Sequence, residues 1–257
     1  MTQIKKIGLI GAGAIGTAIL QDLRSRPDVE IAFVLVRNAK MRSNDLDLPD
    51  GVLTGNENDV LHRSVDLVIE AALPDLVARL GPCLLRGADV CSFSGTALAD
   101  REVEASIRAA CIASGRAFYV PHGAILGLDG LSDGRESIEK VVITTTKSGQ
   151  SLGLGSTQSG VLYEGSARGA CVRFPRNVNV HAAVSLAGLG FDATVSRIVA
   201  VPGQLDNVHR IEVSGPGLSW DIKVSSRSLG GVTGAYTPQS AVGSVRRILG
   251  GGGITLV

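Results

Sequence analysis

Short apolar runs alternate with amphipathic helical stripes through the first half of the chain. The runs predict buried strands at residues 5–10, 30–36, 65–71, 88–93 and 116–121. Between the first two, Ile15, Ile19 and Leu23 recur every four residues, and Val103, Ile107 and Cys111 repeat that spacing before Gly115. Strands that alternate with helices in this way predict an α/β fold built on a doubly wound parallel sheet.

The pattern changes after Pro121. Further strands, rich in β-branched residues and separated by turns, are predicted at residues 138–147, 193–201, 208–214 and 218–224. Helices are predicted at 166–174, 178–189 and 240–249. We therefore expect a first domain over residues 1–121 and a second, α+β domain with a mostly antiparallel sheet over 122–237. We also expect a C-terminal helix, within 238–257, to pack back on the first domain.

Charge and composition exclude several classes of protein. The chain has 25 Lys and Arg against 24 Asp and Glu, a formal net charge of +1, so no nucleic-acid partner is expected. The sequence contains no apolar run of about 18 residues and no signal-peptide pattern, so we expect a cytoplasmic protein without a membrane partner. Its four cysteines lack metal-site or redox spacing and are expected to be reduced and buried, and the histidines form no metal-binding pair. No metal site is predicted.

The segment Gly11-Ala12-Gly13-Ala14-Ile15-Gly16 follows the first strand and opens the first helix. This is the glycine fingerprint of a dinucleotide-binding, Rossmann-type domain, in its confirming strand–turn–helix context. Gly11 permits the tight turn, Gly13 lets a pyrophosphate approach the backbone, and Gly16 allows close packing of helix on strand. The alternative is a tight turn without a ligand.

The end of the second predicted strand bears on the choice between NAD and NADP. A carboxylate that binds the 2′-hydroxyl of NAD is usual there, but the chain has Val36, Arg37 and Asn38. Arg37 could pair with the 2′-phosphate of NADP by charge-assisted hydrogen bonds. We expect NADP to be accepted, and NAD as well; the alternative is a solvated loop arginine.

Five blocks of sequence occur in an order typical of one family. They are GLIGAGAIG at residues 8–16, HGAILGLD at 122–129, YEGSAR at 163–168, FPRNVNV at 174–180 and DNVH at 206–209. Together they resemble the L-aspartate dehydrogenases over nearly the whole chain. The resemblance implies a homodimer in which the second domain is catalytic. It also implies NAD(P)-dependent deamination of L-aspartate to iminoaspartate or oxaloacetate plus ammonia, the reverse amination, and a role in pyridine nucleotide biosynthesis or amino-acid metabolism.

His209 matches the catalytic histidine of that family. In the predicted strand it shares the inward face with Ile211 and Val213, whereas Arg210 and Glu212 point the other way. The alternative is a core histidine with a structural role. The resemblance favours an acid–base residue beside the nicotinamide, because an imidazole titrates near neutral pH.

The resemblance also implies cofactor contacts outside the glycine loop. Asn179 matches a family residue near the nicotinamide, although its place at the start of a predicted helix suits a helix cap equally. Ala124 matches a second cofactor position, where a small side chain lets the ring approach. Ser94 follows a strand end from which cofactor-facing loops emerge. With these, the predicted cofactor residues are Gly11, Gly13, Ala14, Ile15, Gly16, Arg37, Ser94, Ala124 and Asn179.

Two departures from the family leave substrate recognition open. His122 stands where a small residue or proline is usual, and is either a polar group at the nicotinamide or a loop histidine. The loop at residues 234–238 lacks a lysine that relatives often have, so Lys147, Arg168 or Arg173 could bind the substrate carboxylates instead. Two rival functions remain: a reductase of another imine or keto acid, of the dihydrodipicolinate reductase type, and a non-catalytic NAD(P)H sensor.

Overall fold

A computed structural model describes residues 4–229 and 233–250. The chain divides into two compact units. The first unit holds the residues up to Ser94 together with Arg101–Pro121, and the second holds Gly95–Asp100 and the chain from His122 onward. That the first domain binds the dinucleotide and the second is catalytic stays a prediction.

The first unit is built on a six-stranded sheet in which all the pairings are parallel. Its strands, in the order β3-β2-β1-β4-β5-β6, are β3 Leu53–Thr54, β2 Val29–Leu35, β1 Lys5–Ile10, β4 Leu67–Glu70, β5 Asp89–Ser92 and β6 Phe118–Tyr119. The order reverses between β1 and β4, which is where sheets of this kind bind nucleotides, at the carboxyl ends of the strands. The predicted Rossmann-type sheet is confirmed.

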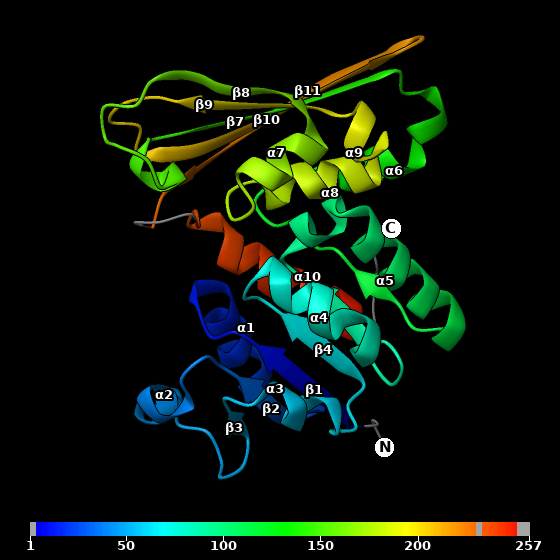
Figure 1. The fold of residues 1–257 in the computed structure, drawn as a ribbon, viewed down its shortest axis with the longest axis vertical. Coiled ribbons are helices and arrows are strands. Elements are labelled where there is room, and N and C mark those ends of the chain that lie inside the picture. Colours follow the sequence, from blue (N-terminus) through cyan, green and yellow to red (C-terminus); the bar gives the residue numbers. More distant parts are fainter. Residues whose placement is uncertain (1–3, 230–232, 251–257) are drawn as a thin grey trace. The chain divides into compact units, whose positions relative to one another are not determined.

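Helices connect the strands of this sheet (Figure 1). They are α1 Ala14–Arg24, α2 Ala39–Leu46, α3 Glu57–Leu61, α4 Pro74–Leu84 and α5 Arg101–Ser114. In α1, the stripe residues Ile19 and Leu23 are almost completely buried, as the spacing predicts. The sequence reading missed α2 and α3, because α2 is a polar segment without an apolar stripe and α3 is only five residues long.

A five-stranded mixed sheet forms the second unit. In the order β11-β10-β7-β9-β8, its strands are β11 Leu218–Arg227, β10 Asp206–Gly215, β7 Lys140–Lys147, β9 Val195–Ala200 and β8 Gly160–Ser166. Only β7 and β9 pair in parallel among these neighbours, so the predicted, mostly antiparallel α+β domain is confirmed. The sequence reading missed β8, whose residues are largely solvent-accessible and whose three glycine and serine positions weaken the strand pattern.

Helices α6 Leu128–Asp133, α7 Ala167–Arg173, α8 Asn179–Ala187 and α9 Gly190–Ala193 lie along one face of this sheet (Figure 1). The side chains that alternate inward along β7, β9 and β10 are buried, and Ile143, Ile198 and Ile211 among them are at most 1% exposed. The single helix predicted at 178–189 is two helices, because the backbone turns at Gly188 and Gly190 has a φ of +83°. A short 3-10 helix, η1 (Gly95–Ala99), belongs to the same unit.

The last helix, α10 Tyr236–Leu249, starts four residues before the predicted segment. It ends at Leu249, and the following Gly250 takes a φ of 76°. Residues 251–257, with most of the run of four glycines, lie outside the described residues. The helix groups with the second unit, and its predicted packing on the first domain stays a prediction.

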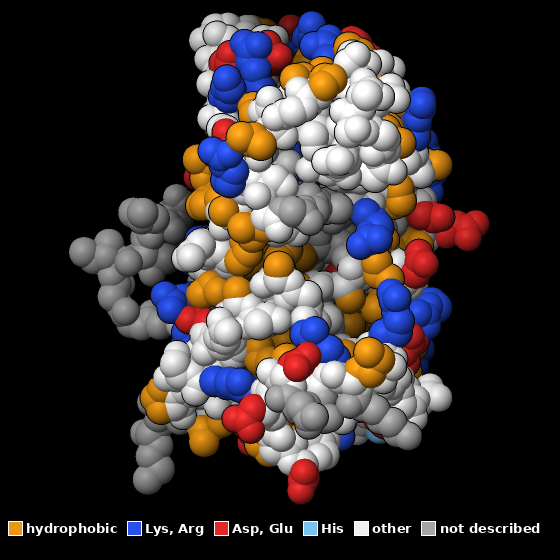
Figure 2. All heavy atoms as spheres, turned by 90° about the vertical axis from the view of Figure 1, so that its left-hand side faces the viewer, with side chains coloured by type: hydrophobic (Ala, Val, Ile, Leu, Met, Phe, Trp, Pro, Cys, Tyr) orange, Lys and Arg blue, Asp and Glu red, His pale blue; other side chains and the backbone are white. Residues whose placement is uncertain are grey.

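The surface charges and the cysteines agree with what the composition predicts, with the exception of one exposed cysteine. On the face shown in Figure 2, Lys and Arg side chains are interspersed with Asp and Glu, as the net charge of +1 suggests. None of the described helices is long and apolar enough to cross a membrane. All four cysteines are free thiols and Cys91 and Cys171 are buried, but Cys83 is exposed on α4, so the expectation that all are buried was wrong.

Candidate active site

The glycine loop between β1 and α1 has the geometry that the fingerprint predicts. Gly11 has a φ of +95°, in the left-handed region that favours glycine, and a Cβ there would lie 2.6 Å from the carbonyl oxygen of Ala71. A Cβ on Gly16 would lie 2.0 Å from the carbonyl oxygen of Gly11, so only glycine lets helix α1 approach the loop this closely. Both glycines are required by the fold itself.

Gly13 differs from these two glycines. Its φ of −77° suits any residue, and a Cβ built on it meets nothing within 4 Å. It is also the N-cap of α1, which has no side-chain cap, so the first N–H groups of the helix stay available for an anion. Neither packing nor backbone strain therefore requires glycine at this exposed position. A glycine here does fit a dinucleotide site, because the missing side chain lets the pyrophosphate approach the start of the helix closely.

Two arginines follow the second strand. Arg37 is exposed just past the end of β2, where the ribose end of a dinucleotide would be expected. Arg42, on α2, donates a hydrogen bond from Nη2 to the carbonyl oxygen of Ala12 at 2.8 Å, inside the glycine loop. The sequence reading missed Arg42 because it lies on a helix that no apolar pattern announces.

A buried carboxylate organises the carboxyl ends of β4 and β5. Glu70 is 2% exposed, and its two oxygens accept hydrogen bonds from the hydroxyls of Ser92 at 2.6 Å and Ser94 at 2.9 Å and from the backbone N–H of Ala72 at 2.7 Å. Burial raises the pKa of Glu70, and these hydrogen bonds oppose that rise. The hydroxyl of Ser94, a predicted cofactor residue, is thus engaged with Glu70. The sequence reading missed Glu70; a charged residue at the end of an apolar strand could have pointed to it, but not to its partners.

In the second unit, His209 occupies the inward face of β10, as strand parity predicts. It is 4% exposed and shares that face with the buried Ile211 and Val213, whereas Arg210 points outward and pairs with Asp221. Its Nδ1 atom lies 2.8 Å from the hydroxyl of Thr145, the residue directly opposite it on β7. The imidazole is therefore held at one nitrogen by the neighbouring strand.

The surroundings of His209 keep its ring neutral. Burial lowers the pKa of His209 well below the ordinary 6.5, and the positive charge of Lys147 and then the ring of His181 lower it further. Lys147 is 2% exposed and lies on the same face of β7 as Thr145, and burial lowers its pKa to about 8. A neutral imidazole next to an amine that is charged at neutral pH suits a base that acts on an anionic substrate.

Asn179 is the first residue of α8, but it does not cap that helix. Val178 is the N-cap residue, and the Asn179 side-chain oxygen lies 3.2 Å from the backbone nitrogen and 3.1 Å from the hydroxyl of Thr96. The helix-cap alternative for Asn179 is therefore wrong. The contact leaves the amide nitrogen of Asn179 as the donor for another group.

Ala124 lies in a tight turn before α6. It is 6% exposed, and the turn is held by the Ile125 N–H, which donates to the His122 carbonyl oxygen at 3.2 Å. The ring of His122 also folds onto this turn, with Nδ1 2.7 Å from the carbonyl oxygen of Ile125. Burial lowers the pKa of His122, which favours a neutral ring. This contact supports the loop alternative for His122.

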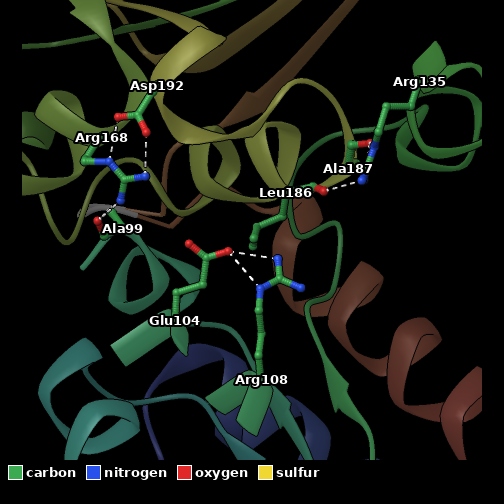
Figure 3. A network of polar contacts seen from close by, with 8 residues as sticks. All are labelled: Ala99, Glu104, Arg108, Arg135, Arg168, Leu186, Ala187 and Asp192. Atoms are coloured by element: carbon green, nitrogen blue, oxygen red, sulfur yellow. Dashed lines mark hydrogen bonds and ion pairs between the residues drawn. The ribbon is translucent and has the colours of Figure 1, made fainter. Parts of the chain in front are cut away.

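The two arginines considered for substrate binding are differently placed, and Figure 3 shows the contacts of Arg168. Arg168 makes a bidentate ion pair with Asp192, with Nε–Oδ1 and Nη2–Oδ2 distances of 2.7 and 2.9 Å, and also donates to the carbonyl oxygen of Ala99. These contacts give Arg168 a structural role. Arg173 is exposed and lies over the ring of Phe174. Of the three candidates named from the sequence, Lys147 is the one whose charge acts on His209.

Arginine also fixes the helix that carries Asn179. Arg135 donates from Nη2 to the carbonyl oxygen of Leu186 at 2.7 Å and from Nε to that of Ala187 at 3.1 Å, at the carboxyl end of α8 (Figure 3). A cation there satisfies the last carbonyl groups of the helix and complements its dipole. In the first unit, Glu104 and Arg108 form an i,i+4 ion pair on the exposed side of α5.

No group of three or more metal-ligating side chains is found among the described residues.

Comparisons with known proteins agree with both halves of the sequence reading. Residues 129–248 match the model of the C-terminal domain of aspartate dehydrogenase, and residues 11–121 match the NAD-binding domain of homoserine dehydrogenase. The chain is 35% identical to the L-aspartate dehydrogenase of Archaeoglobus fulgidus over 224 residues, which is 87% of this chain and 88% of that protein.

Solved structures give the same result at the level of the fold. The crystal structure of aspartate dehydrogenase from Thermotoga maritima superposes with a TM-score of 0.76 at 27% identity, covering 95% of both chains. A dihydrodipicolinate reductase from Paenisporosarcina superposes with a TM-score of 0.53 at 16% identity, covering 95% of this chain and 92% of that one. The second likeness concerns the fold alone.

Proposed function

Because the chain belongs to the L-aspartate dehydrogenase family, we propose that it catalyses the NAD(P)-dependent oxidative deamination of L-aspartate. The products are iminoaspartate and, after hydrolysis, oxaloacetate and ammonia, and the reverse reaction aminates oxaloacetate reductively. The observation that carries the proposal within the structure is His209, a buried, neutral imidazole held at one nitrogen and influenced by the charge of Lys147.

The first unit is proposed as the dinucleotide-binding domain. Gly11, Gly13 and Gly16 shape the loop, and the N–H groups at the start of α1, at Ala14 and Ile15, would bind the pyrophosphate. Arg37 would pair with the 2′-phosphate of NADP. Ser94 would contact the cofactor from the loop after β5, which its hydrogen bond to Glu70 holds in place. In the second unit, Ala124 and Asn179 are the residues proposed to contact the nicotinamide.

Bound NAD(P) supplies the hydride acceptor for oxidation and, when reduced, the hydride donor for amination. The protein must remove a proton from the substrate ammonium group, so that the α-carbon can lose hydride, and must then activate the water that attacks the imine. We assign both proton transfers to His209, because the neutral ring has a free lone pair at neutral pH. His209 releases the ammonium proton to solvent before it accepts a proton from the attacking water, and it then passes this second proton to the departing ammonia.

Lys147 is proposed to bind a substrate carboxylate. Its ammonium group is charged at pH 7 and lies on the inward face of β7, two residues from the Thr145 that contacts His209. A cation buried to this degree attracts an anion more strongly than a solvated one, since water screens it less. Lys147 would thereby take the place of the lysine that the loop at residues 234–238 lacks.

We also propose a homodimer in the cytoplasm that acts on a small dicarboxylate and ammonia. The family resemblance is the support for the dimer, and light scattering of the purified protein would report its mass. The absence of a membrane-crossing helix among the described residues is compatible with this location. Imaging of a tagged protein would test it.

The proposed reaction is tested by mixing the protein with NADPH, oxaloacetate and ammonium and following the absorbance of the reduced nicotinamide. We expect oxidation of NADPH that requires both oxaloacetate and ammonium. A cyclic imine of the dihydrodipicolinate type, in the same assay, is the control for the rival reductase. Binding of NADPH without turnover of either substrate would instead support the sensor and contradict the proposal.

A further inference from the structure

A chain of four buried polar side chains crosses the interior of the second unit. Nδ1 of His209 lies 2.8 Å from Oγ1 of Thr145, which lies 2.6 Å from Nε2 of His181, and Nδ1 of His181 lies 2.8 Å from Oγ of Ser196. Thr145, His181 and Ser196 are fully buried and His209 is 4% exposed. This series of hydrogen-bonded side chains links β10, β7, α8 and β9. It uses atoms that the proposed proton transfers do not use.

Burial makes this arrangement costly unless each polar atom is paired. A hydroxyl or an imidazole N–H loses its water on burial and must find a partner inside the protein. Both nitrogens of His181 have such partners, and burial lowers the pKa of His181 to about 3, so its ring is neutral and carries one proton. The charge of Lys147 also acts on both imidazole rings, and it lowers the pKa of His181 and of His209.

The Thr145 hydroxyl couples the two rings because it has one proton to share between them. If it donates to Nε2 of His181, its oxygen accepts from Nδ1–H of His209. His181 then carries its proton on Nδ1 and donates it to Ser196. In this direction the His209 proton is on Nδ1, and Nε2 keeps the lone pair that a base needs.

We propose that Thr145 and His181 are positioning residues that fix the tautomer of His209, with the proton on Nδ1 and the lone pair on Nε2 toward the substrate. The inference rests on the proposed function, since it concerns the base of that reaction. It assigns His181 a role that an aspartate or a backbone carbonyl fulfils beside many catalytic histidines, namely to orient the ring through its second nitrogen. Here a neutral imidazole does so through a hydroxyl.

Thr145→Val tests the proposal, because valine keeps the shape of threonine and removes the hydroxyl. We expect kcat to fall about 10- to 100-fold, by analogy with the loss of the hydrogen-bond partner of a metal-binding histidine, while KM for aspartate and the Kd for NADPH stay the same. Thr145→Ser, which restores the hydroxyl, should recover most of kcat. Thr144→Val is the matched control on the opposite face of β7 and should leave kcat unchanged.

His181 is tested in the same assay. His181→Leu should lower kcat as Thr145→Val does, and His181→Gln should recover part of it, because the glutamine amide can place an oxygen near the position of Nε2. Should His181→Leu fail to fold, Thr145→Val and Thr145→Ser still decide the matter. In a double-mutant cycle, Thr145→Val should have no further effect on the residual activity of His209→Ala, since both act through one ring.

A direct readout needs no substrate. The ¹⁵N NMR signals of His209, assigned by comparison with His209→Ala, distinguish a protonated ring nitrogen from an unprotonated one. We expect Nδ1 to be protonated in the wild-type protein and the proton to move to Nε2 in Thr145→Val, because a buried N–H without a partner is costly. If His209→Ala is inactive, wild-type kcat in Thr145→Val would overturn the proposal. A His209 tautomer with the proton on Nε2 in the wild-type protein would overturn it in either case.

The two proposals fail separately. If His209→Ala keeps full activity while Thr145→Val changes the tautomer, the proposed acid–base role is wrong and the positioning chain stands. If His209→Ala is inactive while Thr145→Val is fully active, the acid–base role of His209 stands and the positioning role of Thr145 and His181 is wrong.

Discussion

His209 shows both the reach and the limit of sequence reading at the residue scale. Strand parity predicts its inward direction, because Ile211 and Val213 mark the buried face, and the structure confirms that direction. Its partners could not be predicted. Thr145 precedes His209 by 64 residues, and His181 lies between them, 36 residues after Thr145. Only the register of β7 against β10 and the position of α8 bring the three side chains together.

The buried charge of Lys147 predicts how substrate affinity depends on pH. Its pKa is lowered to about 8, so the ammonium form predominates at pH 7 and is lost as the pH rises through 8. If this charge binds a substrate carboxylate, kcat/KM for aspartate should fall about tenfold per pH unit above the pKa.

The pH profile of Lys147→Met provides the comparison. This variant should have a low kcat/KM at every pH and should lack the decline near pH 8. Lys147→Arg, which stays charged throughout, should lack the decline as well. A wild-type profile that is flat between pH 7 and 9, or a Lys147→Met variant with wild-type KM, would contradict the assignment.

Cofactor choice is a second prediction at this scale. Arg37 is exposed after β2, so replacing it should perturb binding rather than folding. Arg37→Asp should lower the affinity for NADPH about tenfold or more and leave the affinity for NADH unchanged, because only NADPH carries the 2′-phosphate. Fluorescence titration of both cofactors measures this. Equal losses for the two cofactors would exclude Arg37 from the phosphate site.

At the scale of elements, strong hydrophobic periodicity was predictive and weak periodicity was not. The buried strands β1, β4 and β5 and helix α1 were predicted within a few residues. The two-residue strand β3, the polar helix α2 and the accessible strand β8 were missed. The two strands are held by pairing with β2 and β9, which lie elsewhere in the sequence, and α2 has no apolar stripe that a local pattern could show.

The start of α1 allows the cofactor reading of the glycine loop to be separated from a purely structural one. Gly13→Ala should leave the melting temperature unchanged, because its backbone suits alanine and its Cβ position is open, yet it should weaken NADPH binding. Gly16→Ala should destabilise the protein, because the new methyl group would meet the Gly11 carbonyl oxygen.

Thermal unfolding with and without NADPH measures both effects. The ligand should raise the melting temperature of the wild-type protein and raise that of Gly13→Ala less. If Gly13→Ala binds NADPH as tightly as the wild-type protein does, the loop is a turn that does not hold the pyrophosphate.

At the scale of the whole molecule, the order of motifs along the chain was more informative than any single motif. The glycine loop alone indicates a dinucleotide, and a lone buried histidine indicates little. Five blocks in family order predicted L-aspartate dehydrogenase, and the 35% identity to the Archaeoglobus fulgidus enzyme over 87% of this chain confirms the family. Buried pairings such as those of Glu70 with Ser92 and Ser94 stayed beyond prediction, because they depend on which strands are neighbours.

The most direct test of the account is the turnover of His209→Ala in the reductive amination of oxaloacetate, with NADPH binding measured on the same sample. We predict that kcat falls by about 10² to 10⁴, as expected for loss of an acid–base residue, while the Kd for NADPH is unchanged. Wild-type turnover in this folded, NADPH-binding variant would contradict the account and leave His209 with a structural role only.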